Sequence, residues 1–151
     1  MARYKKLKLI CDACCVVPNA HIRGRAGKGK AACGVVILDE DENIIIEKAK
    51  YLGEMTVPQA EYNGLIFAMD IAAGHCRDNL DVWMDSELVI KQMNGEYGIK
   101  SENMKPLFDE VKKIAGRFNG KVQYFHHGRT TKWGKYADKL AKAEYNKNQI
   151  G

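Results

Sequence analysis

The stretch LDVWMDS, residues 80–86, decides the fold class. It is short and almost entirely apolar up to Asp85, a pattern that favours a strand covered on both faces. A second run, LKLICD at residues 7–12, also ends on an aspartate, Asp12. If these two strands are parallel neighbours, both carboxylates lie at the carboxyl edge of one sheet, where sites in such sheets usually lie.

The segments around these two runs indicate further strands. Apolar patterning predicts strands over 6–13, 32–39 and 44–51, and the turn residues at 41–43 favour an antiparallel meander. One more strand is predicted over 121–125, close to the end of the chain. Together with the run that ends at Asp85, the sequence therefore predicts five strands.

Apolar residues at helical spacing predict about four helices. The first covers 57–73 and the last follows a loop at 126–132. Between them, Asp85 or Ser86 caps one helix, and Ser101 caps another. The order β-β-β-α-β-α-α-β-α predicts an α/β fold with a five-stranded mixed sheet, made of a three-stranded antiparallel meander plus two parallel strands, flanked by these helices.

Length and composition are those of an ordinary globular protein. The 151 residues, 46% of them hydrophobic, predict a single domain over 1–151. No apolar run approaches the roughly 20 residues of a membrane helix, and the basic N-terminus leads into no signal-peptide core. We therefore expect a soluble cytoplasmic protein without membrane contact. The net charge of +5 suits a polyanion partner without proving one.

The five cysteines do not suggest a disulfide framework or a zinc site. Cys11 and Cys14 have C-x-x-C spacing, but Cys33 and Cys76 stand alone and supply no second ligand pair. In a strand, Cys11 and Cys14 also point to opposite faces. Buried thiols acting as small apolar side chains are the better interpretation.

Four carboxylates occur in settings that could aim them at one point. Asp12 and Asp85 end strands, Glu61 opens a helix, and Asp138 lies in the last helix. Clustered carboxylates repel one another, and a divalent cation relieves the repulsion. Their hard oxygen atoms favour Mg²⁺ or Mn²⁺ over zinc, and a pair of such ions can support phosphodiester cleavage.

In the order and spacing of these residues the chain resembles the type 1 ribonuclease H family. The matching features are Asp12 in the first strand, Glu61 early in the first helix, the Asp85-Ser86 pair, and the stretch ADKLA at residues 137–141. No single motif is specific, but four in order on the expected elements are. The resemblance covers nearly the whole chain.

The resemblance implies an endoribonuclease that hydrolyses the RNA strand of RNA–DNA hybrids and leaves 5′-phosphate and 3′-hydroxyl ends. Two Mg²⁺ ions, with Mn²⁺ as a possible substitute, would be held by Asp12, Glu61, Asp85 and Asp138. The family often places a mobile His, or in short forms an Arg, before the last Asp. Here His127 and Arg129 are the candidates, assisting product release or leaving-group protonation. Trp133 could anchor the helix start in the core or stack on a sugar or base.

The chain is similar to the short, archaeal-like forms of the family, because residues 92–100 leave no room for a basic helical protrusion. Contact with the substrate is then expected from the loops at 23–30 and 128–135. The candidate substrate-binding residues are Asn19, Thr56, Gln59, Ser86 and Lys132. The chain departs from the family pattern at Ala13-Cys14, where Gly-Ser or similar is usual, and at 56–61, where asparagines are missing.

Two alternatives remain at this point. One is a catalytically inactive module of the same fold that binds hybrid or duplex RNA by charge and shape. The other is a DNA-cutting integrase or junction resolvase of the same superfamily, which the small chain disfavours. Cleavage of double-stranded RNA is open, and we expect a monomer with no obligate protein partner.

Overall fold

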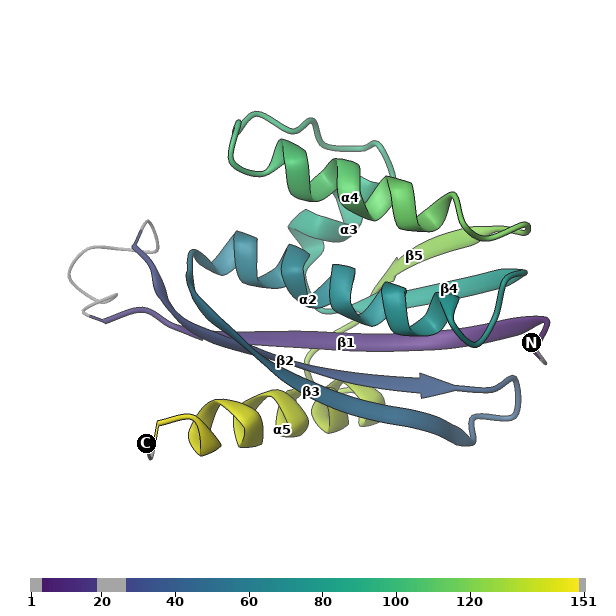
Figure 1. The fold of residues 1–151 in the computed structure, drawn as a ribbon, viewed down its shortest axis with the longest axis horizontal. Helices are drawn as coiled ribbons and strands as arrows, with labels where there is room; N and C mark the ends of the chain where they lie inside the picture. Colours follow the sequence, from purple (N-terminus) through teal and green to yellow (C-terminus); the bar gives the residue numbers. More distant parts are fainter. Residues whose placement is uncertain (1–3, 19–26, 150–151) are drawn as a thin grey trace.

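The computed structural model describes residues 4–18 and 27–149, which form one mixed sheet with helices on both faces (Figure 1). The strand order is β3-β2-β1-β4-β5. The strands are β1 (Lys6–Val16), β2 (Gly29–Leu38), β3 (Ile44–Met55), β4 (Asn79–Met84) and β5 (Val122–His126). The helices are α2 (Val57–Ala73), α3 (Glu87–Met93), α4 (Lys105–Ala115) and α5 (Lys132–Lys147).

Strand pairing confirms the predicted fold class. β1 pairs antiparallel with β2, and β2 pairs antiparallel with β3, which makes the meander. On its other edge β1 pairs parallel with β4, and β4 pairs parallel with β5. The two apolar runs that end on aspartates are therefore parallel neighbours in the middle of the sheet.

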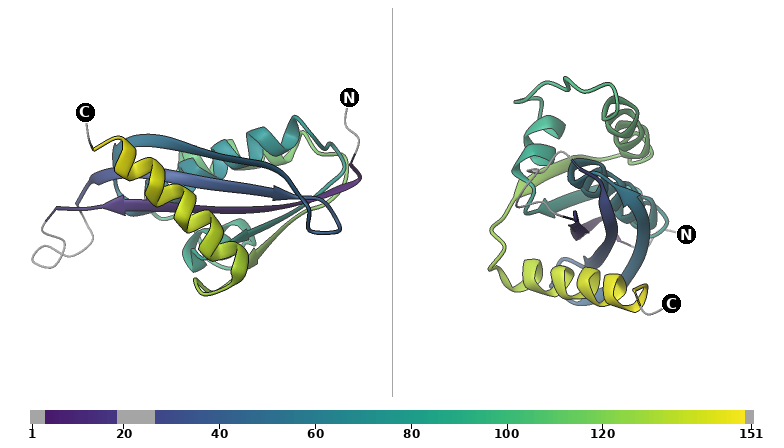
Figure 2. Two further views of the ribbon diagram at one scale, coloured as in Figure 1. Left: turned by 90° about the horizontal axis from the view of Figure 1, so that it is seen from below. Right: turned by 90° about the vertical axis from the view of Figure 1, so that its left-hand side faces the viewer.

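The two faces of the sheet are covered by different helices. α2 and α4 lie on one face and α5 crosses the other, as the end-on view in Figure 2 shows. Alternation along β1 divides its side chains between two cores. Leu9 and Cys11 join the large cluster under α2, whereas Ile10 joins a smaller cluster with Val36 and Leu38 under α5.

Several element boundaries differ from the prediction. β1 continues to Val16 and β3 to Met55, because each is held by ladder pairs with β2 well beyond the predicted ends. Ser101 does not cap α4; its hydroxyl accepts from the Asn103 N–H in a preceding turn. The helix begins at Lys105 with a proline in its first turn, where a missing N–H costs nothing.

Three of the thiols, Cys11, Cys33 and Cys76, are buried as predicted, whereas Cys14 and Cys15 are only partly buried. All five cysteines are free. Cys11 is buried on the α2 side, and the Cys14 thiol lies 3.6 Å from the Ala141 carbonyl of α5, so the two side chains point to opposite faces. Within residues 4–18 and 27–149, no helix is long and apolar enough to cross a membrane.

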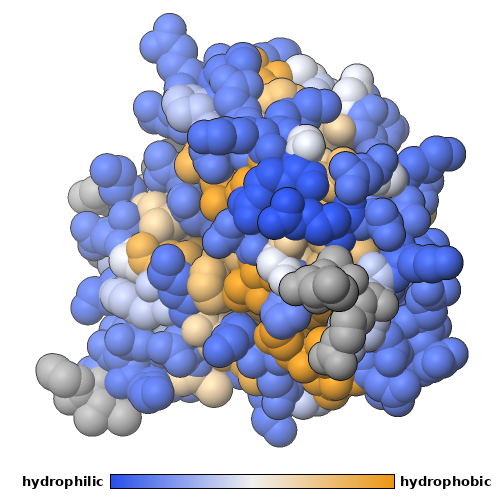
Figure 3. Space-filling model, turned by 45° about the vertical axis from the view of Figure 1, so that its right-hand side comes forward, coloured by the Kyte–Doolittle hydropathy of each residue, from blue (hydrophilic) through white to orange (hydrophobic). Residues whose placement is uncertain are grey.

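The molecular surface is largely hydrophilic in the view of Figure 3, with an apolar area surrounded by hydrophilic residues. The large apolar side chains exposed among the described residues are Val16, Ile44, Leu88 and Tyr97. Leu88 and Tyr97 lie near each other on the α2 side, where they line a groove described below.

Candidate active site

Asp12 and Asp85 reach the same edge of the sheet because their strands are in register. Ile10 pairs with Trp83 in the parallel β1–β4 ladder, and each aspartate lies two residues further along its strand. Asp12 therefore shares the α5-facing side of the sheet with Ile10. Asp85 follows the last residue of β4 directly, before Ser86 caps α3 through the Val89 N–H at 3.3 Å.

Two helices bring the remaining carboxylates to this edge. α2 starts with a capping box in which Thr56 and Gln59 exchange hydrogen bonds of 2.9 and 3.3 Å. This fixes the first turn, and Glu61 follows in the second. α5 starts at the Thr131 cap, whose hydroxyl accepts from the Gly134 N–H at 3.2 Å, and carries Asp138 in its second turn.

The four carboxylates line one cavity of about 550 Å³. We call it the carboxylate cavity; its charged lining residues are Asp12, Glu61, Asp85, Asp138, Arg129 and Lys142. The acids come from elements far apart in the sequence: Asp12 from within β1, which continues past the predicted strand end, Asp85 from the end of β4, and the other two from α2 and α5. The arrangement thus gathers four negative side chains at a place where the fold itself needs none of them.

Asp12 experiences the strongest electrostatic strain in the cavity. Burial, the negative charge of Asp85 and the nearby carboxyl of Asp138 together raise the pKa of its carboxyl to about 8, with burial the largest cause. Burial also raises the pKa of Glu61, while a hydrogen bond from the Ser86 hydroxyl opposes that increase. Both shifts show that the site carries more negative charge than its own surroundings stabilise.

Two cations reach into the cavity from its rim. Arg129 Nε lies 3.4 Å from Asp85 Oδ2, and Lys142 Nζ lies 3.0 Å from Asp138 Oδ2. The Arg129 side chain is 89% exposed, so it approaches the carboxylate from solvent. Lys142 is one of the basic residues that flank Asp138 in the sequence but was not among the predicted site residues, although its position four residues after Asp138 on a helix was a usable signal.

The donor set fits hard divalent cations. Four carboxylates offer only oxygen atoms, the ligands that Mg²⁺ and Mn²⁺ prefer, and the raised pKa of Asp12 marks a charge excess that a cation relieves. In residues 4–18 and 27–149, no three His, Cys, Asp or Glu side chains already stand as a formed metal site. The carboxylates surround the cavity without converging on one point.

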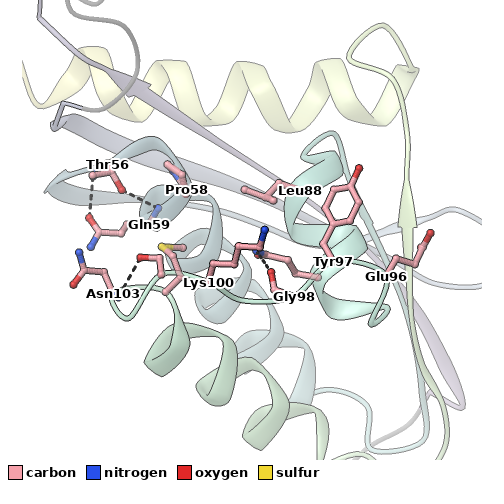
Figure 4. Close-up of a pocket in the computed structure, with 12 residues that line it drawn as sticks. Thr56, Pro58, Gln59, Leu88, Glu96, Tyr97, Gly98, Lys100 and Asn103 are labelled. Atoms are coloured by element: carbon pink, nitrogen blue, oxygen red, sulfur yellow. Dashed lines mark hydrogen bonds between the residues drawn. The ribbon is translucent and has the colours of Figure 1, made fainter.

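A second depression lies beside the first, on the α2 side. This groove, of about 680 Å³, is lined by the start of α2, by α3 and by the segment that leads to α4 (Figure 4). Thr56 and Gln59 line it next to Glu61 of the carboxylate cavity. The remaining polar lining is contributed by Gln92, Glu96, Tyr97, Lys100, Ser101 and Asn103. We call it the α2–α3 groove.

His127 and Arg129, the two candidates in the β5–α5 loop, face different places. Arg129 lines the carboxylate cavity. His127 is half-buried, with its ring centroid 6.2 Å from that of Trp83 and its Nδ1 3.4 Å from the Thr131 hydroxyl. Burial lowers the pKa of His127, although the charge of Asp85 opposes the decrease. The structure therefore brings Arg129, not His127, to the wall of the cavity.

The predicted substrate-binding residues are spread over the molecule. Thr56 and Gln59 line the α2–α3 groove, while Ser86 is buried and caps α3. Lys132 is exposed, with its Nζ 4.7 Å from the centroid of the Trp133 ring. Asn19 and the first half of the basic loop at 23–30, residues 23–26, lie outside the described residues.

Residues 21–144 match the protein-family model described as "Reverse transcriptase-like". The chain belongs to this family. Its similarity to type 1 ribonucleases H, expected from the four carboxylates, is confirmed by sequence relatives and by solved structures.

Three proteins illustrate the similarity of this reverse transcriptase-like chain. The bifunctional protein Rv2228c of Mycobacterium tuberculosis is 31% identical over 83% of this chain. The structure of its N-terminal RNase H domain superposes with a TM-score of 0.80 and covers 93% of this chain and 94% of its own. Ribonuclease HI of Halobacterium salinarum is 35% identical over 54% of this chain, and its structure covers 94% of this chain and 98% of its own at a TM-score of 0.81. LC11-RNase H1, isolated from compost, was solved with an RNA/DNA hybrid; it is 28% identical, with a TM-score of 0.79 over 95% and 99% of the two chains.

The chain covers only part of the length of the sequence relatives that it matches. This chain spans about a third of the mycobacterial protein, 34%, and 41% of the haloarchaeal one. In this reverse transcriptase-like chain, residues 94–104 are all described and contain no helix between α3 and α4. That agrees with the short form expected from the sequence, which lacks a basic protrusion.

Proposed function

We propose that this chain is an endoribonuclease that hydrolyses the RNA strand of RNA–DNA hybrids. The observation that carries the proposal is that Asp12, Glu61, Asp85 and Asp138 line a single cavity. Similarity to two proteins named as ribonucleases H, one of them solved with a hybrid, supports the choice of substrate. The modest net charge of +5 suits a polyanion.

In this proposal Asp12, Glu61, Asp85 and Asp138 hold two Mg²⁺ ions, which Mn²⁺ can replace. The chemistry that a bound pair supplies is activation of the attacking water and stabilisation of the departing 3′ oxygen, giving 5′-phosphate and 3′-hydroxyl ends. Burial and the neighbouring carboxylates, which together raise the pKa of Asp12, are the properties of this chain that favour such binding. The hydroxyl of Ser86 supports the ionised form of Glu61.

The cations at the rim act on the substrate rather than on the fold. Arg129 is 89% exposed and already beside Asp85, so its guanidinium is placed to meet a phosphate that enters the cavity. We assign it the role of stabilising charge on the cut phosphate or the leaving group. Lys142, paired with Asp138, contributes positive charge on the opposite wall.

The α2–α3 groove accommodates the second strand in this proposal. It adjoins the carboxylate cavity, and it offers the Lys100 ammonium together with hydroxyl and amide groups of Thr56, Ser101 and Asn103. Such groups typically contact phosphates and sugars without reading sequence. Asp12 and Glu61 accept hydrogen bonds from the 2′-hydroxyl of the RNA strand, the group that separates RNA from DNA.

Cleavage of a panel of substrates tests this function against its alternatives. An RNA–DNA hybrid, duplex RNA, duplex DNA and a four-way DNA junction are each labelled on both strands and incubated with the protein and Mg²⁺. We expect cutting of the RNA strand of the hybrid and no cutting of any DNA strand. Cutting of the junction or of duplex DNA would instead favour the DNA-cutting relatives, and retention of hybrid without cutting would favour an inactive binding module.

A further inference from the structure

The α5-side face of the sheet is not evenly covered. α5 packs chiefly on β1, β2 and β3, as the view from below in Figure 2 shows, and leaves β4 and β5 open on this side. Trp83 of β4 and Phe125 of β5 are paired in the ladder, and their rings stack with centroids 4.6 Å apart. Both side chains are only partly buried.

A hollow of about 210 Å³ lies where this open face meets the start of α5. Its floor is made by Ile10 and Leu38 of the small core. Around this floor stand two indole rings, those of Trp83 and Trp133, and two lysines, Lys8 and Lys132. We call it the aromatic hollow.

Glu42 holds the walls of the aromatic hollow in place. Its Oε1 accepts a hydrogen bond from Trp133 Nε1 at 3.3 Å, and its Oε2 accepts one from Lys8 Nζ at 3.1 Å. Glu42 sits at the tip of the β2–β3 hairpin with a φ of +62°, a left-handed conformation that a non-glycine residue adopts at a cost. The Lys132 ammonium lies 4.7 Å from the centroid of the Trp133 ring. An indole and an ammonium are therefore fixed before any ligand arrives.

The aromatic hollow lies beside the carboxylate cavity, because neighbouring residues of the β5–α5 segment line the two depressions. Trp83 lies in β4, two residues before Asp85, which directly follows the last residue of that strand. The loop between β5 and α5 forms the ridge between the two depressions, with His127 facing the hollow and Arg129 facing the cavity. A strand that leaves the carboxylate cavity over this ridge passes directly onto the hollow.

Flat aromatic walls combined with ammonium groups match the chemistry of a nucleotide. Every base has a π-face that stacks on indole, and the attached phosphate is attracted to lysine. We propose that the aromatic hollow binds an unpaired nucleotide next to the hybrid, with its base against Trp83 or Trp133 and its phosphate near Lys8 and Lys132. The inference rests on the proposed function for the presence of a nucleic acid, and adds that the substrate has a single-stranded flank.

Equilibrium binding in EDTA, where no cutting occurs, tests the inference. A blunt hybrid is compared with hybrids that carry a short single-stranded overhang at each of the four strand ends in turn. One overhang geometry should raise affinity about tenfold over the blunt hybrid, the scale of stacking one base. Trp83→Leu should remove this gain while the blunt hybrid still binds as to wild type. Equal affinity for all five substrates, or a gain that survives Trp83→Leu, would overturn the inference.

A matched pair of surface variants keeps the test independent of folding. Lys132→Gln and Lys135→Gln remove the same charge from the first turn of α5, and both side chains are exposed, but only Lys132 lines the hollow. The gain from the overhang should fall in Lys132→Gln and persist in Lys135→Gln; an equal effect of the two would overturn the inference even if Trp83→Leu does not fold.

A second readout separates this inference from the proposed function. A short single-stranded oligonucleotide without any hybrid should quench the tryptophan fluorescence of the wild type, and less so that of Trp83→Leu. If blunt hybrid is neither bound nor cut, the proposed function fails, yet quenching still shows an occupied hollow. If hybrid is cut normally but the oligonucleotide causes no quenching, the hollow is not a nucleotide-binding site and only the proposed function is retained.

Discussion

Gly34 lies directly opposite Asp12 in the β1–β2 ladder, and this pairing sets how closely α5 approaches the first candidate catalytic strand. A Cβ at Gly34 would meet the Ala137 carbonyl and would come within 2.8 Å of the Ala141 amide nitrogen. Because Asp138 follows Ala137 directly on α5, the bare glycine backbone is what lets Asp138 come near Asp12. The distance between two carboxylates is thus governed by a residue that carries no side chain.

Gly34→Ala should therefore damage both stability and activity. The new methyl pushes α5 away from β2, at a cost of about 2 kcal/mol in the free energy of unfolding. Urea denaturation measures the loss, and RNA cleavage should fall more than the unfolded fraction explains, since Asp138 moves with its helix. Gly128→Ala is the control, because nothing lies within 4 Å of a Cβ at Gly128. A Gly34→Ala protein with wild-type turnover would show that the helix position does not matter.

The raised pKa of Asp12 predicts that stability depends on pH in the absence of metal. A carboxyl with a folded pKa of about 8 keeps its proton where the unfolded chain has lost it. Its contribution to stability is therefore full below about pH 4 and is lost as the pH rises to about 8. In EDTA, Asp12→Asn should match wild type near pH 4 and be more stable by about 2 kcal/mol above pH 8. Chemical denaturation across this range measures the difference; identical pH profiles would contradict the crowded-carboxylate picture.

Arg129 and His127 should contribute unequally to turnover. Arg129 lines the carboxylate cavity, whereas His127 lines the aromatic hollow. Arg129→Ala should lower kcat roughly tenfold, less than the loss of a buried donor because the side chain is largely exposed, with Arg129→Lys retaining part of the activity. His127→Ala should have the smaller effect. Steady-state cleavage of a labelled hybrid decides between them, and a larger loss in His127→Ala would reverse the assignment.

A buried polar contact should connect stability with the shape of the α2–α3 groove. The Tyr62 hydroxyl donates to Gln92 Oε1 at 2.6 Å, and Gln92 Nε2 donates to the Gly98 carbonyl at 3.4 Å. Gln92→Ala leaves the Tyr62 hydroxyl without its acceptor and opens a cavity, which should cost about 2–3 kcal/mol in urea denaturation. Gln123→Ala, an exposed glutamine on β5, should change stability little. Equal stability of the two variants would refute this role for Gln92.

Much of the architecture was predictable because local pattern and global fold agree. The bounds of α2, residues 57–73, were predicted from apolar spacing and confirmed without change, since Thr56 and Gln59 cap the helix locally. The mixed sheet followed from the order of elements. The ends of the strands could not be predicted from local pattern, because they depend on pairing between strands. β1 extends to Val16 because β2 continues to pair with it.

The candidate site was predictable in its acids and not in its surroundings. Strand ends and helix starts made Asp12, Glu61, Asp85 and Asp138 visible in the sequence, and the fold places all four on one cavity. The difference between Arg129 and His127 depends on how the β5–α5 loop crosses the sheet edge, which no spacing encodes. The aromatic hollow joins Glu42 to Trp133 across most of the chain, a contact that only the folded structure reveals.

The most direct test of the central claim is a gel assay on end-labelled RNA annealed to DNA. Wild type and Asp85→Asn are compared in Mg²⁺, in Mn²⁺ and in EDTA, with Asp109→Asn, an exposed acid on α4, as the matched control. We expect metal-dependent cutting of the RNA by wild type and Asp109→Asn, and a loss on the order of a hundredfold or more in Asp85→Asn. Wild-type turnover in Asp85→Asn, or no cutting by wild type in either metal, would contradict the account.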